Sequence, residues 1–215
     1  MLFRSDNERD QFYFANALDE ITRHLRQSRQ PLFTYILTMA THSPYDFVYM
    51  PEADVPGGGP GTDPEMSEYL RRLAMARIDY DELRREIVRR FPNERFLIVH
   101  YGDHHPIATR TLLGVSNKLD AEDVSLRFDS LGFVTYYAVE GINYTPPPLP
   151  EVELLDVPYL PLVILNAAGL PLSDSYRERE RLLTVCNGRY FACEQRDAIL
   201  AFHRRLIDSG LVESR

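Results

Sequence analysis

Four stretches of this 215-residue chain are short, almost continuously apolar and rich in β-branched and aromatic residues. Such runs are typical of strands that are buried on both faces, and these strands need helices above and below them. Segments with helical periodicity lie between the stretches. We therefore expect one α/β domain over residues 1–215, with a mixed, mostly parallel sheet and helices on both faces. The predicted strands are 31–41, 95–101, 132–142 and 159–169.

Four segments place apolar residues on one side of a helix, and these are 7–28, 64–90, 172–184 and 194–210. Ser5 and Asp6 precede the first segment, and either residue can cap it. The second segment starts with Asp63 followed by Pro64, which combines a capping residue with a proline at the first helical position.

Two stretches between these elements are too rich in proline and glycine for regular structure. Residues 43–62 include the run Gly57 to Gly59, and we expect them to form a mobile loop. Residues 145–157 hold four prolines and are expected to be an exposed linker. The glycine run lacks the Lys-Ser or Lys-Thr pair of a phosphate-binding P-loop, so we interpret it as a hinge or linker.

The composition excludes several classes of protein. Apolar residues make up 44% and charged residues 26% of the chain, as in soluble globular proteins, and no apolar run is long enough to cross a bilayer. The first residues lack the basic and apolar regions of a secretory signal. A net charge of −8 argues against nucleic acid as a partner, and the arginine-rich segment 64–90 is expected to present a solvated helix face.

Cys186 and Cys193 are the two cysteines, with Asn187 and Gly188 available for a turn between them. Their spacing fits either a disulfide in an oxidising compartment or two buried thiols, and it does not decide between them. A zinc site is disfavoured, because no second pair of Cys or His residues accompanies them.

Two predicted strands end on histidine-containing turns, at the edge of the sheet where α/β proteins bind ligands. One turn contains His42 and follows the first strand; the other is Gly102-Asp103-His104 and follows the second. Packing explains Asp103 poorly, because burying a carboxylate without a partner is unfavourable. A sharp turn at glycine would let this carboxylate and the adjacent imidazole face one divalent cation, whose other ligands must come from elsewhere.

The other histidines have simpler interpretations. His24 and His203 lie on amphipathic helices and are expected at the surface, and His100 is expected to be a hydrogen-bonded core residue of its strand. Neither Ser43 nor Ser175 lies in the G-x-S-x-G elbow of a serine hydrolase.

Three segments together resemble a known family, and these are PLFTYILTMATHSPYDF (31–47), RFLIVHYGDHHP (95–106) and LPLVILNAAGLPLSDSYRER (160–179). In this order and spacing they resemble the C-terminal half of the sulfatase-like branch of the alkaline phosphatase superfamily, above all lipoteichoic acid synthases and related phosphoglycerol or phosphoethanolamine transferases. The resemblance extends over most of the chain, and the Gly-Asp-His turn is its most specific part. It implies the C-terminal portion of an alkaline-phosphatase-like sandwich.

The resemblance implies roles for three residues. Asp103 and His104 match the pair that helps to hold a single divalent cation, with manganese or magnesium favoured over calcium or zinc. His42 matches the histidine that contacts the phosphate or sulfate group of the substrate, where it would stabilise charge on the oxygens. The substrate would be a phosphate or sulfate ester on a lipid head group or glycan, at the periplasmic face of the inner membrane.

The chain departs from the family in its first part. The nucleophilic threonine or serine and the first acidic metal ligand should lie far upstream of residue 31, and no residue matches either of them. We therefore expect a partial domain that carries half of the metal site and is inactive alone. Missing strands would also expose a sheet edge, and through this edge the chain is expected to form a homo-oligomer.

Two alternatives stay open. The triplet Asp103-His104-His105 also fits DHH phosphoesterases, which use manganese, but their Asp-x-Asp signature and their glycine-rich histidine motif are missing. The second alternative is a non-catalytic binding or regulatory module that retains the metal-binding turn.

Overall fold

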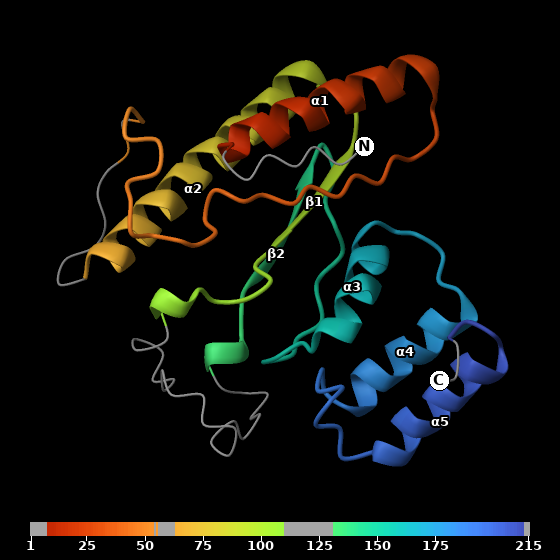
Figure 1. Ribbon diagram of the computed structural model, residues 1–215. Coiled ribbons are helices and arrows are strands. Elements are labelled where there is room, and N and C mark those ends of the chain that lie inside the picture. Colours follow the sequence, from red (N-terminus) through yellow and green to blue (C-terminus); the bar gives the residue numbers. More distant parts are fainter. Residues whose placement is uncertain (1–7, 54, 56–62, 110–130, 213–215) are drawn as a thin grey trace. The chain divides into compact units, whose positions relative to one another are not determined.

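The computed structural model describes residues 8–53, 55, 63–109 and 131–212 (Figure 1). The chain divides into two compact units, Met1–Asn93 with Pro106–Asn117 and Glu94–His105 with Lys118–Arg215. The expected combination of helices and strands is confirmed. The mostly parallel sheet with helices on both faces is wrong for this part of the chain, because its sheet is a single antiparallel pair. Three short 3-10 helices complete the described elements: η1 (Ile107–Thr109), η2 (Leu131–Phe133) and η3 (Val157–Tyr159).

The first unit contains the two long helices that the periodicity predicts. Helix α1 spans Asp10–Gln27 and helix α2 spans Pro64–Arg90. The Asp63 carboxylate caps α2 by accepting a hydrogen bond from the Met66 amide at 2.8 Å, and proline occupies the first turn. The predicted start of this helix is therefore confirmed.

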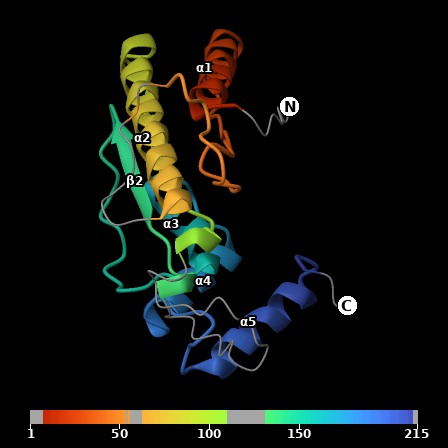
Figure 2. The same ribbon diagram turned by 60° about the vertical axis from the view of Figure 1, so that its left-hand side comes forward.

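Helices α1 and α2 lie side by side and run in the same direction (Figure 1, Figure 2). Near the start of α1, the Asp79 carboxylate of α2 accepts hydrogen bonds from Arg9 Nε at 2.8 Å and from the Gln11 amide at 3.1 Å. Further along both helices, Arg90 pairs with Asp19 at 3.3 Å. Polar contacts thus fix the register of the two helices at both ends of their contact.

The prediction of a buried strand over residues 31–41 is wrong. The segment leaves the end of α1 and returns alongside it (Figure 1), and the Ala40 amide donates to the Asp10 carboxylate at 3.4 Å. Within the described part of the chain it pairs with no strand, and Phe33 is 80% and Tyr35 62% exposed. The local sequence favours an extended chain, but a strand also needs a neighbour with which to form hydrogen bonds.

The second unit holds the sheet. Strand β1 spans Phe96–Tyr101 and pairs antiparallel with strand β2, Tyr137–Ile142, over its whole length. β1 coincides with a predicted strand. β2 is only the second half of the predicted strand 132–142, because the residues before it form η2 and a short irregular segment.

The prediction of a strand over residues 159–169 is wrong, because these residues form helix α3, Leu160–Ala167. Pro161 lies in the first turn of α3, where no amide donor is needed. Leu162 and Ala167 face the interior and are almost fully buried. A short, fully apolar run does not distinguish a buried strand from a buried helix, and here the packing of one helical face decides.

Helices α4 (Asp174–Val185) and α5 (Arg196–Asp208) confirm the two predicted C-terminal helices. They pack with α3 and η3 around the main apolar core of this unit. The side chains at its centre are Tyr159, Leu162, Leu182 and Phe202, each at most 1% exposed.

The stretches predicted to lack regular structure, 43–62 and 145–157, contain no α-helix or strand where the structure describes them. The glycine run Gly57 to Gly59 lies outside the described residues. Ser5 and Asp6, the expected caps of α1, also lie outside them.

Cys186 and Cys193 form a disulfide, with the sulfur atoms 2.02 Å apart. The bond closes a turn in which Asn187 and Gly188 have positive φ angles of 47° and 78°. A Cβ atom at Gly188 would lie 2.3 Å from the Leu154 carbonyl oxygen, so only glycine fits there. Of the two alternatives for the cysteines, the structure shows the disulfide.

Loss of this disulfide is expected to lower the free energy of unfolding by about 2 to 3 kcal/mol, because the closed loop restricts the unfolded chain. The double variant Cys186→Ser, Cys193→Ser tests this in urea unfolding followed by circular dichroism. Dithiothreitol should destabilise the wild type to the same extent and leave the variant unchanged. Coinciding unfolding curves for the variant and the oxidised wild type would contradict the prediction.

Candidate functional site

The turn after β1 is anchored to residues 134–136, which lead into β2. Gly102 is bound through both its amide and its carbonyl, and His105 is bound through its ring. Asp103 and His104 lie between these two anchors, so their backbone is fixed while their side chains project into solvent. The anchoring hydrogen bonds are Gly102 N to Tyr136 O at 3.2 Å, Thr135 Oγ1 to Gly102 O at 2.7 Å and His105 Nε2 to Val134 O at 2.6 Å.

The hydrogen bonds of Asp103 and His104 leave one ligand atom on each side chain. Asp103 Oδ1 accepts from the His104 amide at 2.8 Å, which leaves Oδ2 available. His104 Nδ1 lies 3.1 Å from the His105 carbonyl oxygen; it must carry the proton, and the lone pair is on Nε2. Asp103 Oδ2 and His104 Nε2 lie 3.6 Å apart, and the two side chains are 72% and 69% exposed.

This pair is suited to bind a divalent cation. Two ligand atoms that are each about 2.1 Å from one ion lie about 3.0 to 3.4 Å apart, and the observed separation is 3.6 Å. Metal-bound histidines commonly donate their other ring N–H to a backbone carbonyl, as His104 does. In the described part of the chain, no group of three or more His, Cys, Asp or Glu side chains is placed to hold a metal. Asp103 and His104 could therefore supply two ligands, and a metal site would need at least one more.

His42 is exposed and lies in a loop of the first unit, residues 42–49, which we call the His42 loop. Arg72 of α2 binds this loop and holds its conformation. Arg72 Nη1 donates to the His42 carbonyl at 2.8 Å, and Nη2 donates to the Phe47 carbonyl at 3.3 Å. The guanidinium carbon also lies 5.0 to 5.1 Å from the ring centroids of Tyr45, Phe47 and Tyr49. One arginine thus holds both the backbone and the aromatic side chains of the loop.

The His42 ring has one nitrogen available for a ligand. Nδ1 lies 2.6 Å from the Ser43 carbonyl oxygen, so it carries the proton and Nε2 is free to accept a hydrogen bond. A hollow of about 330 Å³ adjoins the ring and is lined by Met39, Ala40, Ser43, Pro44, Phe47, Tyr49 and Arg72. Nε2 is thus the one ring nitrogen of His42 left for a ligand, and when it carries a proton it could donate to an ester oxygen.

Glu68 holds Arg72 in place. Its carboxylate accepts from Arg72 Nε at 2.7 Å, from Arg71 Nε at 2.9 Å and from the Tyr49 amide at 2.8 Å. Burial alone would raise the pKa of Glu68, but these hydrogen bonds hold it below its ordinary value. The expected solvated helix face is therefore wrong for Arg71 and Arg72, which are buried. It is confirmed for the exposed Arg77, Arg85 and Arg89, each paired with an acid three or four residues away.

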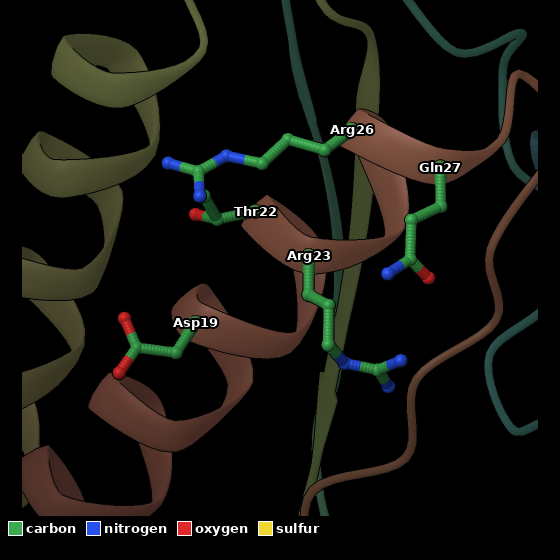
Figure 3. Close-up of a pocket in the computed structure, with 5 residues that line it drawn as sticks. All are labelled: Asp19, Thr22, Arg23, Arg26 and Gln27. Carbon is green, nitrogen blue, oxygen red and sulfur yellow. The ribbon is translucent and has the colours of Figure 1, made fainter.

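A second hollow, of about 370 Å³, lies on the surface of α1 and shares no residue with the His42 loop. Figure 3 shows that its side chains leave a single helix in different directions. Asp19 pairs with Arg90, and Arg23 pairs with Glu20. The Thr22 hydroxyl donates to a backbone carbonyl of α1. These groups do not converge on a common point, so the hollow is not a candidate site.

No family model matches this chain, and searches of curated proteins and of solved structures found no match. The resemblance to sulfatase-like enzymes therefore stays a prediction. His42 belongs to the first unit, whereas Asp103 and His104 belong to the second. Their expected position in one cleft also stays a prediction. Among the helices that the structure describes, none has the length and apolar character of a membrane span.

Two of the remaining histidines are accounted for by hydrogen bonds near the surface, as expected. His24 Nε2 donates to the Gln30 carbonyl at 2.7 Å, and His203 Nε2 lies 2.6 Å from the Tyr190 hydroxyl. The expectation of a core position is wrong for His100, whose side chain is exposed in β1. A two-stranded sheet leaves more strand surface in contact with solvent than the larger sheet that the sequence predicts.

Arg72 of α2, which holds the His42 loop, is the residue that sequence reasoning missed. Two signals were available in the sequence. Glu68 precedes Arg72 by four residues, one turn of helix, and aromatic residues alternate at positions 45, 47 and 49. Neither signal alone distinguishes a buried arginine from a surface ion pair, because burial depends on the fold of a loop more than twenty residues away.

Proposed function

We propose that this chain belongs to the sulfatase-like branch of the alkaline phosphatase superfamily and supplies two ligands of a divalent metal site for phosphate or sulfate esters. One observation carries the proposal: Asp103 Oδ2 and His104 Nε2 face each other on an exposed turn whose flanking residues are anchored. The hydrogen bond at Nδ1 also selects the tautomer in which Nε2 can bind a metal.

Each candidate residue has a distinct task in this function. Asp103 and His104 would hold the cation, with manganese or magnesium favoured. When bound, the cation would neutralise charge on the ester oxygens. His42 would act as the family's histidine that contacts the phosphate or sulfate group, and Arg72 sets the position of the loop that carries it. No residue matches the nucleophile or the first acidic ligand, so we expect binding rather than turnover from these 215 residues.

The Cys186–Cys193 disulfide supports an extracytoplasmic location for this function. Disulfides persist in oxidising compartments and are rare where thiols are kept reduced. The location at the periplasmic face of a membrane, and a lipid head group or glycan as the bearer of the ester, follow from the proposed family.

Manganese binding tests the proposal directly. The wild type should bind Mn²⁺ weakly in an EPR titration, because two exposed ligands leave water in the other positions. Asp103→Asn should lower the affinity at least about tenfold, since the amide keeps the hydrogen bond to the His104 amide but carries no charge. Asp174→Ala, at an aspartate that is 97% exposed, is the control and should bind as the wild type does. Equal affinities for Asp103→Asn and the wild type would overturn the proposal.

A non-catalytic binding module is the second candidate, and the two-ligand site favours it. Chromogenic phosphodiester, phosphomonoester and sulfate ester substrates, assayed with added Mn²⁺, separate it from an enzyme. Mn²⁺ binding without turnover would identify a module. Turnover that is lost in Asp103→Ala and kept in Asp174→Ala would identify an enzyme.

A further inference from the structure

Residues 32–38 form an uncharged segment whose backbone is unpaired. In the described part of the chain, no backbone hydrogen bond joins them to another segment, and they belong to no sheet. Exposed strand edges are normally protected by lysine, proline or a bulge. The sequence Leu-Phe-Thr-Tyr-Ile-Leu-Thr has no such protection, and the nearest charged residues on either side are Arg29 and Asp46.

Residues 32–35 are exposed on both faces of this segment, and exposure alternates only from Tyr35 to Thr38. Phe33, Tyr35 and Leu37 are 80%, 62% and 48% exposed. Ile36 and Thr38 are half-buried, and Ala40, two residues further on, packs in a core cluster with Tyr49 and with Met75 of α2. The outward face is therefore as apolar as the inward face, although nothing in the described part of the chain covers it.

We propose that residues 32–38 pair antiparallel with the same residues of a second copy of this chain, about a two-fold axis at Tyr35. In this register Phe33 lies opposite Leu37, and Tyr35 lies opposite its own copy, which places the exposed apolar side chains in one continuous stripe. Arg29 would fall opposite Thr41, so no like charges face each other. This matters because the chain as a whole carries a net charge of −8.

The exposed area determines how strong this pairing is. Phe33, Tyr35 and Leu37, which form this stripe, offer on the order of 400 Å² of mainly apolar surface per copy. A symmetric pair would bury only part of the roughly 800 Å² on the two copies, because one face of a two-stranded ribbon stays open to solvent. The interface is therefore smaller than the roughly 1,200 Å² of a stable dimer. Main-chain hydrogen bonds between the two strands would add to this. The expected assembly is therefore a weak, reversible dimer.

A single cysteine at the two-fold axis tests the register. Both native cysteines are in the disulfide, so Tyr35→Cys introduces the only free thiol. Residues directly opposite in an antiparallel pair have Cα atoms about 4.5 to 5.5 Å apart, which a disulfide can span. Mild oxidation should convert Tyr35→Cys to a covalent dimer. Val88→Cys, at a residue of α2 that is 52% exposed, should stay mainly monomeric. Equal cross-linking of the two variants would overturn the proposed register.

Analytical ultracentrifugation tests the dimer without a label. The wild type should show a reversible monomer–dimer equilibrium, and Phe33→Lys with Tyr35→Lys should remain monomeric because like charges then face each other. Val88→Lys should behave as the wild type does. A wild type that stays monomeric at all concentrations, or that grows beyond a dimer, would overturn the proposal. EDTA in the buffer makes the outcome independent of the metal site of the proposed function.

Discussion

Arg72→Ala is expected to lower the free energy of unfolding by about 3 to 5 kcal/mol, the range found when one partner of a buried ion pair is removed. The substitution removes a hydrogen-bond donor from Glu68 and from the carbonyls of His42 and Phe47. It also removes the guanidinium from among three aromatic rings. Arg71 still binds Glu68, so we expect a value near the lower end of the range.

Urea unfolding followed by circular dichroism measures this change, since the chain has no tryptophan. Arg77→Ala is the matched control on the same helix: its side chain is 74% exposed and pairs with Asp81, so its loss should change stability by no more than about 0.5 kcal/mol. Arg72→Lys should lower the free energy of unfolding nearly as much as Arg72→Ala does, because an ammonium cannot stack on the rings or bind two carbonyls in a plane. Similar stabilities of Arg72→Ala and Arg77→Ala would contradict the prediction.

The helices could be predicted from the sequence because their signals are local. The periodicity of α1, α2, α4 and α5 is sustained over three or more turns, and the start of α2 is marked by Asp63 and Pro64. Each of these features involves residues only a few positions apart, and the hydrogen bonds of a helix also join residues that are four positions apart.

The strands were less predictable because pairing is not local. Residues 31–41 have the composition of a strand, but no neighbouring strand lies beside them in the described part of the chain. Residues 159–169 are apolar at almost every position, so their sequence fits a helix and a strand equally well, and the packing of α3 against α4 and η3 decides.

The candidate site shows the same difference between local features, which the sequence predicts, and features that depend on distant residues. The juxtaposition of Asp103 and His104 could be predicted because the two residues are adjacent and follow a glycine. The tautomer of His104 and the anchoring of the turn could not, since they depend on backbone carbonyls at His105 and Val134. Arg72 was missed for the same reason, as its partners lie in a loop that is distant in the sequence.

Asp10→Asn is expected to raise the free energy of unfolding at pH 8 by up to about 3 kcal/mol. Burial of the Asp10 carboxyl, which is 4% exposed, together with the nearby charge of Asp79, raises its pKa from 3.8 to about 6. The Ala40 amide and Arg9 oppose this rise without cancelling it. At pH 8 the folded chain must therefore hold a buried charge, which asparagine does not have.

The contribution of Asp10 to the free energy of unfolding decreases as the pH rises. Below pH 3.8, Asp10 is protonated in both the folded and the unfolded chain, and its full contribution to stability is present. Between pH 3.8 and about 6, the folded chain keeps a proton that the unfolded chain releases, so stability falls as pH rises, by about 1.4 kcal/mol per pH unit. Above that range the loss is complete. Glu68 acts in the opposite sense, because its lowered pKa gives stability that is present above pH 4.5 and lost as the pH falls.

The difference in the free energy of unfolding between Asp10→Asn and the wild type reports on Asp10 alone, since Glu68 contributes equally to both proteins. Measured by urea unfolding, the stability gain of Asp10→Asn over the wild type should be near zero at pH 4. It should grow as the pH rises through 6 and stay constant above pH 7. Asp197→Asn makes the same chemical change at an exposed residue in the first turn of α5, and it should show no such growth. The asparagine oxygen can still accept the hydrogen bond from the Ala40 amide, so the substitution removes the charge and keeps this contact. A difference that is the same at pH 4 and pH 8 would therefore exclude the buried charge as its cause.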